Sequence, residues 1–164
     1  MSTFAERCVL AVLGYAALTN YQALVADANE VRQELRQERG GRTERLVSQW
    51  QEIRPNAEVA AQFYKIDMTV ARRGRRRANH EQQQFFEEQL FASVNFWRIA
   101  GEDIAAGRVD AGTLSAYLGA DARAWLALLQ QQEGRWDEAR AAQIALAIKG
   151  LELLVYQEQR HQII

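Results

Sequence analysis

The sequence predicts an all-α protein in which a long N-terminal helix is followed by a bundle of about five or six helices. Proline occurs once, at Pro55, and most glycines lie between segments whose apolar residues recur with helical spacing. An acidic cap, an apolar stripe and a closing glycine follow one another repeatedly along the chain. No segment favours a strand instead. We therefore expect residues 1–39 to form the long helix and residues 42–164 to form the bundle.

The long N-terminal helix is predicted by an apolar seam. Its apolar residues recur at alternating intervals of four and three, which is the spacing of helices that pack along one another. Gly40 and Gly41 predict the end of this helix, because glycine readily adopts the left-handed conformation of a helix C-cap and loses more entropy inside a helix. The seam consists of Leu10, Gly14, Ala17, Tyr21, Leu24, Ala28, Val31 and Leu35.

Two shorter helices are expected next, on either side of the proline. Thr43 is a plausible N-cap for a helix over residues 43–53, and Pro55 should end it, because the residue before a proline avoids helical angles. Asn56 is then a plausible N-cap for a helix over residues 57–70.

Four more helices are predicted in the second half of the chain, over residues 79–106, 110–119, 121–134 and 137–159. Each range combines an apolar stripe with a start or stop signal. The predicted starts are Asp110, Asp121 and Asp137, and the predicted stops are Gly107, Gly119 and Gly134.

The run at residues 8–18, CVLAVLGYAAL, predicts contact with a membrane or with another helix. Eleven residues rise about 16 Å, whereas a hydrocarbon core is about 30 Å thick, so a span would need to extend to about residue 26. Arginines follow the run rather than precede it, so the positive-inside rule predicts an inner-membrane helix with a cytoplasmic C-terminal domain. The alternative is a cytoplasmic protein whose first helix packs in an oligomer. The candidate residues are Cys8, Leu10, Leu13, Gly14, Ala17, Leu18, Tyr21 and Leu24.

An arginine cluster, RRGRRR, occupies residues 72–77 and is the sharpest local charge feature. It could hold nucleic-acid phosphates, anionic lipid headgroups or an acidic partner. The ordinary explanation is a solvated loop that pairs with nearby carboxylates. No aromatic residues alternate with the arginines as base stacking would require, so nucleic-acid binding is not the favoured function. The cluster comprises Arg72, Arg73, Arg75, Arg76 and Arg77.

Residues 85–97, FFEEQLFASVNFW, concentrate aromatic side chains on more than one face of their predicted helix. Core packing is the default explanation for such a stripe. The aromatic residues nevertheless cover more than one face of a lone helix, which implies neighbours on two sides or a partner chain. They are Phe85, Phe86, Phe91, Phe96 and Trp97.

Composition and motifs argue against an enzyme. The 20 basic and 21 acidic residues nearly cancel, so no overall charge would draw the chain to nucleic acid or to anionic lipid. The single cysteine cannot form an internal disulfide. No phosphate-binding loop or glycine-flanked nucleophile occurs, and the pair Glu158 and His161 lacks the second pair that a helical di-metal site needs. We expect neither a metal nor a cofactor.

Three segments resemble an uncharacterised bacterial domain-of-unknown-function family of small proteins that have an N-terminal membrane helix and a helical cytoplasmic part. The segments are NFWRIAGEDIAAGRVD at residues 95–110, LSAYLG at residues 114–119 and the tryptophan Trp125. The resemblance implies a membrane helix near residues 8–26 and brings no known activity.

The favoured hypothesis is a non-enzymatic, membrane-anchored helical protein that binds a protein partner or itself. The first alternative is a soluble bundle that self-associates through the seam between Leu10 and Leu35 and acts as an adaptor or inhibitor. The second is nucleic-acid binding through residues 72–77.

Overall fold

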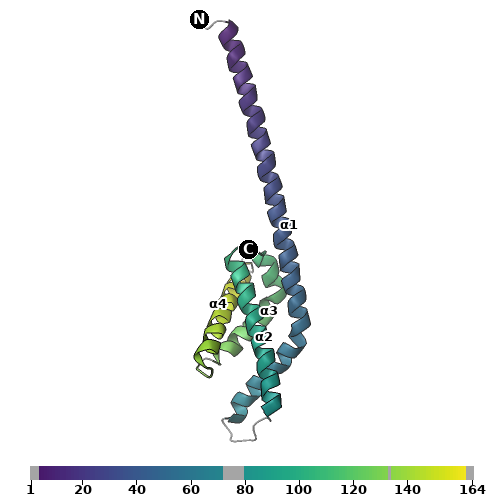
Figure 1. Cartoon of the computed structure of the whole chain (residues 1–164), viewed down its shortest axis with the longest axis vertical. Helices are drawn as coiled ribbons and strands as arrows, with labels where there is room; N and C mark the ends of the chain where they lie inside the picture. The colour runs from purple at the N-terminus through teal and green to yellow at the C-terminus, as the bar shows by residue number, and fades with distance from the viewer. Residues whose placement is uncertain (1–3, 72–79, 133, 162–164) are drawn as a thin grey trace. The chain divides into compact units, whose positions relative to one another are not determined.

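The described part of the chain forms four α-helices (Figure 1). A computed structural model describes residues 4–71, 80–132 and 134–161, and gives the backbone alone for residues 4–19, 66–71, 158, 160 and 161. No strand occurs in these ranges, which confirms the all-α prediction. The helices are α1 (Phe4–Ala71), α2 (His80–Ala105), α3 (Ala111–Gln130) and α4 (Glu138–His161).

The chain divides into two units, Met1–Glu38 and Arg39–Ile164. Every described side chain of the first unit, from residue 20 onward, is exposed. The second unit, which we call the helical body, contains the rest of α1 together with α2, α3 and α4. All the buried apolar side chains of the described residues belong to the helical body.

The predicted long helix is present, but the bundle of five or six helices after it is wrong. The first reason is that α1 continues through Gly40 and Gly41 instead of ending there. Two glycines cost about 1 kcal/mol each relative to alanine in a helix interior. The next two residues offset that cost, because Arg42 and Thr43 both make polar contacts within the helical body.

Pro55 also fails to end α1, so the predicted helices at residues 43–53 and 57–70 are parts of one helix. Proline removes one intrahelical hydrogen bond and crowds the preceding turn, which bends a helix when tertiary packing holds both sides of it. Packing does so here, because Trp50 and Ala57 are both buried in the helical body. Figure 1 shows α1 changing direction in this part of the chain.

The third wrong boundary lies inside α3, which runs unbroken through Gly119 and Asp121. Gly119 is buried within the helix. Asp121 does not cap a helix but accepts a hydrogen bond from the indole Nε1 of Trp50 at 2.7 Å. By contrast, Asp110 is confirmed as the N-cap of α3, because its side chain accepts from the backbone N–H of Thr113.

An aromatic cluster around Trp50 forms the centre of the core. The Trp50 ring lies 4.5 Å from the ring of Trp97, 5.0 Å from that of Phe96 and 6.0 Å from that of Trp125, measured between centroids. These contacts join α1 to α2 and α3. Because the Trp50 indole N–H is paired with Asp121, the large ring is buried without an unsatisfied donor.

Helices α2 and α4 cross in direct backbone contact at Gly101 and Gly150. A methyl group added to Gly101 would lie 2.2 Å from the Cα of Gly150, and one added to Gly150 would lie 2.6 Å from the carbonyl oxygen of Trp97. No side chain larger than hydrogen fits at either position. Helix α4 also packs on α3, so this crossing sets how closely α4 approaches the other helices.

We expect Gly101→Ala to lower the free energy of unfolding by about 3 kcal/mol, because the two helix backbones must separate. Gly41→Ala is the matched control, because a methyl group there meets no atom within 4 Å. It should raise stability by up to about 1 kcal/mol through its helix propensity. Urea unfolding followed by circular dichroism measures both values, and equal stability of the two variants would contradict the close crossing.

Candidate interaction surfaces

A buried carboxylate joins three segments of the helical body. Asp103, near the end of α2, is 1% exposed. Its Oδ2 accepts from Arg42 Nε at 2.6 Å, and its Oδ1 accepts from Arg42 Nη2 and Arg108 Nε, both at 2.8 Å. Beside it, the Thr43 hydroxyl accepts the backbone N–H of Asp110 at 2.9 Å. Helix α1 is thereby fixed to the corner between α2 and α3.

Asp103 has the perturbed ionisation that often marks a functional group. Burial by itself would raise the pKa of its carboxyl, but the hydrogen bonds and charges of Arg42 and Arg108 outweigh burial and hold that pKa below its usual range. A carboxylate that is ionised and paired with two guanidinium groups is a weak base with no free access for a substrate. Its role in the fold is structural.

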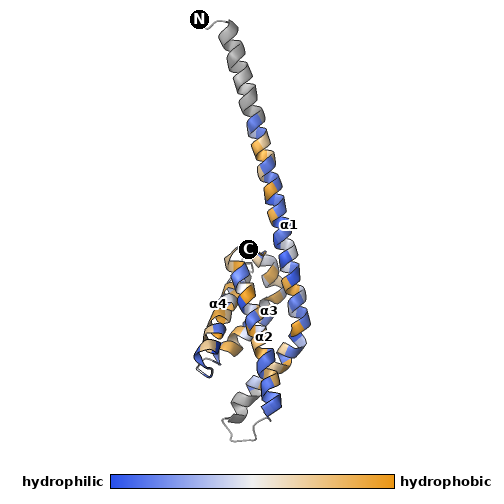
Figure 2. Ribbon diagram, viewed as in Figure 1, coloured by the Kyte–Doolittle hydropathy of each residue, from blue (hydrophilic) through white to orange (hydrophobic). Residues whose placement is uncertain are grey.

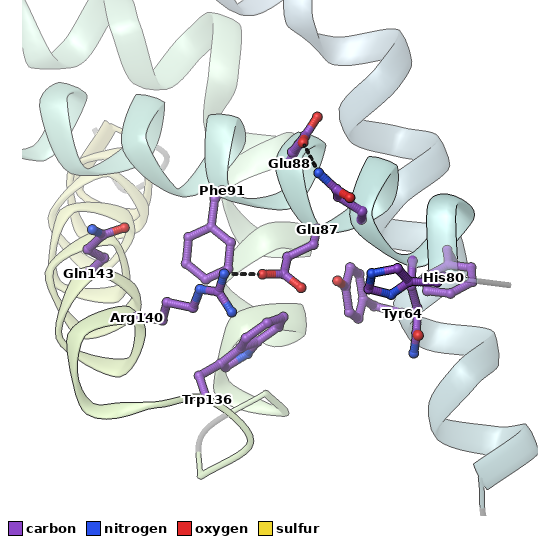
Figure 3. Close-up of a pocket in the computed structure, with 11 residues that line it drawn as sticks. Tyr64, His80, Glu87, Glu88, Phe91, Trp136, Arg140 and Gln143 are labelled. Atoms are coloured by element: carbon purple, nitrogen blue, oxygen red, sulfur yellow. Dashed lines mark hydrogen bonds and ion pairs between the residues drawn. The ribbon is translucent and has the colours of Figure 1, made fainter. Parts of the chain in front are cut away.

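A groove of about 740 Å³ lies where the C-terminal part of α1, the start of α2 and the start of α4 come together (Figure 3). Its lining combines aromatic rings with three glutamine amides and two carboxylates. Phe91 and Trp136 meet edge to face with their ring centroids 5.1 Å apart. The residues that line it are Phe63, Tyr64, His80, Gln83, Gln84, Glu87, Glu88, Phe91, Trp136, Arg140 and Gln143.

Arg140 fills part of this groove from α4. Its guanidinium carbon lies 5.5 Å from the centroid of the Phe91 ring and 5.8 Å from that of Trp136, and the group pairs with Glu87. Figure 3 shows the Arg140 guanidinium between the two rings, with the Glu87 carboxylate beside it. A cation here is stabilised by the faces of two aromatic rings and by one carboxylate, as in sites that bind cationic side chains. The chain supplies that cation itself.

The polar groups that line the groove include glutamine amides, the Glu87 and Glu88 carboxylates, the His80 imidazole and the Arg140 guanidinium. Among the described residues no serine, threonine, cysteine or lysine lines it. The indole Nε1 of Trp136 is buried and makes no hydrogen bond within the described part of the chain.

An apolar seam on the N-terminal unit is the second candidate surface. We define the exposed seam as Tyr21, Leu24, Ala28, Val31 and Leu35, which follow the heptad spacing of the sequence. The four larger side chains are 46–67% exposed. Figure 2 shows hydrophobic turns alternating with hydrophilic ones along this stretch of α1. Water-exposed apolar side chains in a continuous row are typical of a surface that another protein covers.

Part of the predicted membrane or oligomer contact can be placed. Tyr21 and Leu24 are exposed on α1. The side chains of Cys8, Leu10, Leu13, Gly14, Ala17 and Leu18 lie outside the described residues, as does the arginine cluster Arg72, Arg73, Arg75, Arg76 and Arg77. No helix that could cross a bilayer is present in the part of the chain whose side chains are described.

The predicted aromatic face of α2 divides among three environments. Phe96 and Trp97 are buried in the core around Trp50. Phe86 and Phe91 are half-buried, with Phe86 stacked on Phe63 at 4.3 Å between centroids and Phe91 lining the groove. Phe85 is exposed.

Tyr64, Trp136 and Arg140 were not singled out by sequence reasoning. They come from segments far apart in the chain, and only the fold brings them to the groove. A weak signal exists at Trp136, because an apolar residue directly before an N-cap often packs on the helix that follows. Asp137 is that cap, and its Oδ1 accepts the backbone N–H of Arg140 at 3.0 Å.

Within the described residues no group of three or more histidine, cysteine, aspartate or glutamate side chains could hold a metal ion. Comparison with protein-family models, with curated proteins and with solved structures finds no match to this chain.

We expect Asp103→Asn to lower the free energy of unfolding by about 3 kcal/mol at pH 7, because Arg42 and Arg108 lose their buried anion. The folded pKa of Asp103 is depressed, so its stabilisation is complete above the unfolded pKa of about 4 and is lost as pH falls through the folded value. The difference in unfolding free energy between variant and wild type should therefore become smaller in acid.

The control for this prediction is Glu102→Gln, which removes an exposed neighbouring carboxylate. Its effect should stay below about 1 kcal/mol. Urea unfolding at pH 7 and at pH 3 measures both variants. A gap between Asp103→Asn and wild type that persists unchanged at pH 3 would contradict the assignment.

Proposed function

We propose that this chain is a non-enzymatic helical interaction protein and that the exposed seam of α1 binds another helix. The observation that carries this proposal is the row of large apolar side chains from Tyr21 to Leu35, all exposed to water. Leaving an apolar side chain exposed forgoes about 1.5–3 kcal/mol relative to full burial. A neighbouring helix would recover part of that free energy.

The surroundings of the seam favour a protein partner over lipid for its C-terminal half. Val31 and Leu35 lie among charged residues of the same helix, including Arg32 and Glu34. Charged side chains at the depth of a bilayer core are costly, whereas they suit the flanks of a helix pair. The groove beside Arg140 offers a further contact surface on the helical body.

Membrane anchoring through residues 8–26 is a second candidate function, and it is compatible with the first. Its support is the run at residues 8–18, which contains no charged side chain. The arginines that follow the run favour insertion with the helical body in the cytoplasm.

Replacing Leu24 and Leu35 together by aspartate tests the seam. We expect the double variant to have the mass of a single chain in sedimentation equilibrium at a concentration where the wild type is associated. Gln22→Asp with Gln33→Asp is the control, because it adds the same charge to exposed positions outside the seam. Two results would refute the proposal. One is a wild type that stays a single chain at about 100 µM and binds no other helical protein. The other is a double variant that associates as strongly as the wild type.

Cell fractionation tests the anchor separately. If residues 8–26 insert, the wild type sediments with membranes and resists extraction by alkaline carbonate, whereas Leu13→Arg with Leu18→Arg moves to the soluble fraction, because a charge at the centre of a span costs about 3 kcal/mol. Recovery of the wild type in the soluble fraction without detergent would exclude anchoring and leave the seam proposal standing.

A further inference from the structure

We infer that the helix bound by the exposed seam is the same helix of a second copy of this chain, in parallel orientation and in register. The inference rests on the proposed function and adds the identity and direction of the partner. It follows from how charged residues are placed on the two flanks of the seam.

The seam residues occupy the two core positions of a heptad. Tyr21, Ala28 and Leu35 fall at position a, and Leu24 and Val31 fall at position d. The next two core positions are Glu38 and Arg42. Arg42 is paired with Asp103 within the helical body, so the seam ends where that body begins.

Acidic and basic side chains form separate stripes on either side of the seam. The acidic stripe includes Asp27 and Glu34 at position g, and the basic stripe includes Arg32 and Arg39 at position e. The full acidic stripe is Asp27, Glu30 and Glu34, and the full basic stripe is Arg32, Arg36 and Arg39.

This pattern is unfavourable for a helix that stands alone. Between residues 27 and 39 no acidic and basic side chains lie three or four positions apart, which is the spacing at which they would pair on one helix. Like charges do lie at that spacing, as in Glu30 with Glu34 and Arg32 with Arg36. Asp27, Arg32 and Glu34 make no ion pair among the residues whose side chains are described. The stripes are therefore complementary to another helix and not to their own.

A parallel copy in register supplies that complement. In such a pair, position g of one helix lies beside position e of the following heptad in the other. Asp27 then meets Arg32 of the second copy, Glu34 meets its Arg39, and two-fold symmetry repeats both pairs. Four attractive contacts flank a narrow apolar seam, as in two-stranded coiled coils.

An antiparallel copy would have the opposite electrostatics. Position g of one helix then faces position g of the other, and e faces e. The two acidic stripes would lie against each other, and so would the two basic stripes. Like-charge contacts across a helix pair disfavour that alignment. The charge pattern thus discriminates between the two directions.

Cysteine cross-linking of the full chain in a Cys8→Ser background tests direction and register. Ala28→Cys and Leu35→Cys, made separately, should each give a disulfide-linked dimer under mild oxidation, because equivalent a positions face each other in a parallel pair. A single antiparallel alignment can place only one of the two opposite itself. Gln33→Cys is the control, because position f points away from the seam, and it should not cross-link.

Charge exchange tests the flanking pairs. Asp27→Arg should weaken self-association about fivefold in sedimentation equilibrium, because two attractive contacts become repulsive. Adding Arg32→Asp to the same chain restores opposite charges across the pair and should return the affinity to that of the wild type. Arginine has a higher helix propensity than aspartate, so the single variant favours the helix at least as well as the wild type and the double variant do, and loss of helix does not explain its weaker association.

The outcomes separate this inference from the proposed function. If Leu24→Asp with Leu35→Asp abolishes association but Ala28→Cys and Leu35→Cys do not both cross-link, the seam binds a helix and the parallel pair is wrong. If the wild type is a single chain and binds a different protein through the seam, the inference that the partner is a second copy is wrong. If Asp27→Arg is not rescued by Arg32→Asp, the pairing of the stripes is wrong.

Discussion

The ionised, buried carboxylate of Asp103 is the constraint on which the helical body depends. An anion with almost no exposure must be met by cations and donors, and here it draws Arg42 from α1 and Arg108 from the turn after α2. Thr43 adds a hydrogen bond to the start of α3. With this corner fixed, Trp50 is set two turns further along α1, against the aromatic rings of α2 and α3.

Helix content and several helix ends could be predicted from the sequence, because caps act locally. Asp110 caps α3 as expected, and Gly107 has the positive φ of a helix stop. The internal boundaries at Gly40, Pro55 and Gly119 could not be predicted correctly. At each of them a local cost of about 1–3 kcal/mol is outweighed by packing on either side, and that packing depends on residues distant in sequence.

The two candidate surfaces differ in how far the sequence reveals them. The exposed seam is a property of one helix, so its heptad spacing is readable from the chain, and the structure adds that Tyr21 to Leu35 remain uncovered. The groove is assembled from three helices. Trp136 and Arg140 meet Phe91 only because the crossing at Gly101 brings α4 against α2.

The cluster around Trp50 has an optical consequence. Three of the four tryptophans, Trp50, Trp97 and Trp125, belong to it, and the nearest ring centroids are 4.5 Å apart. The indole N–H of Trp50 donates to the Asp121 carboxylate, so this ring has both aromatic and charged neighbours. Three of the chain's four indoles therefore lie at the junction of α1, α2 and α3, which makes that junction observable by intrinsic fluorescence without any added label.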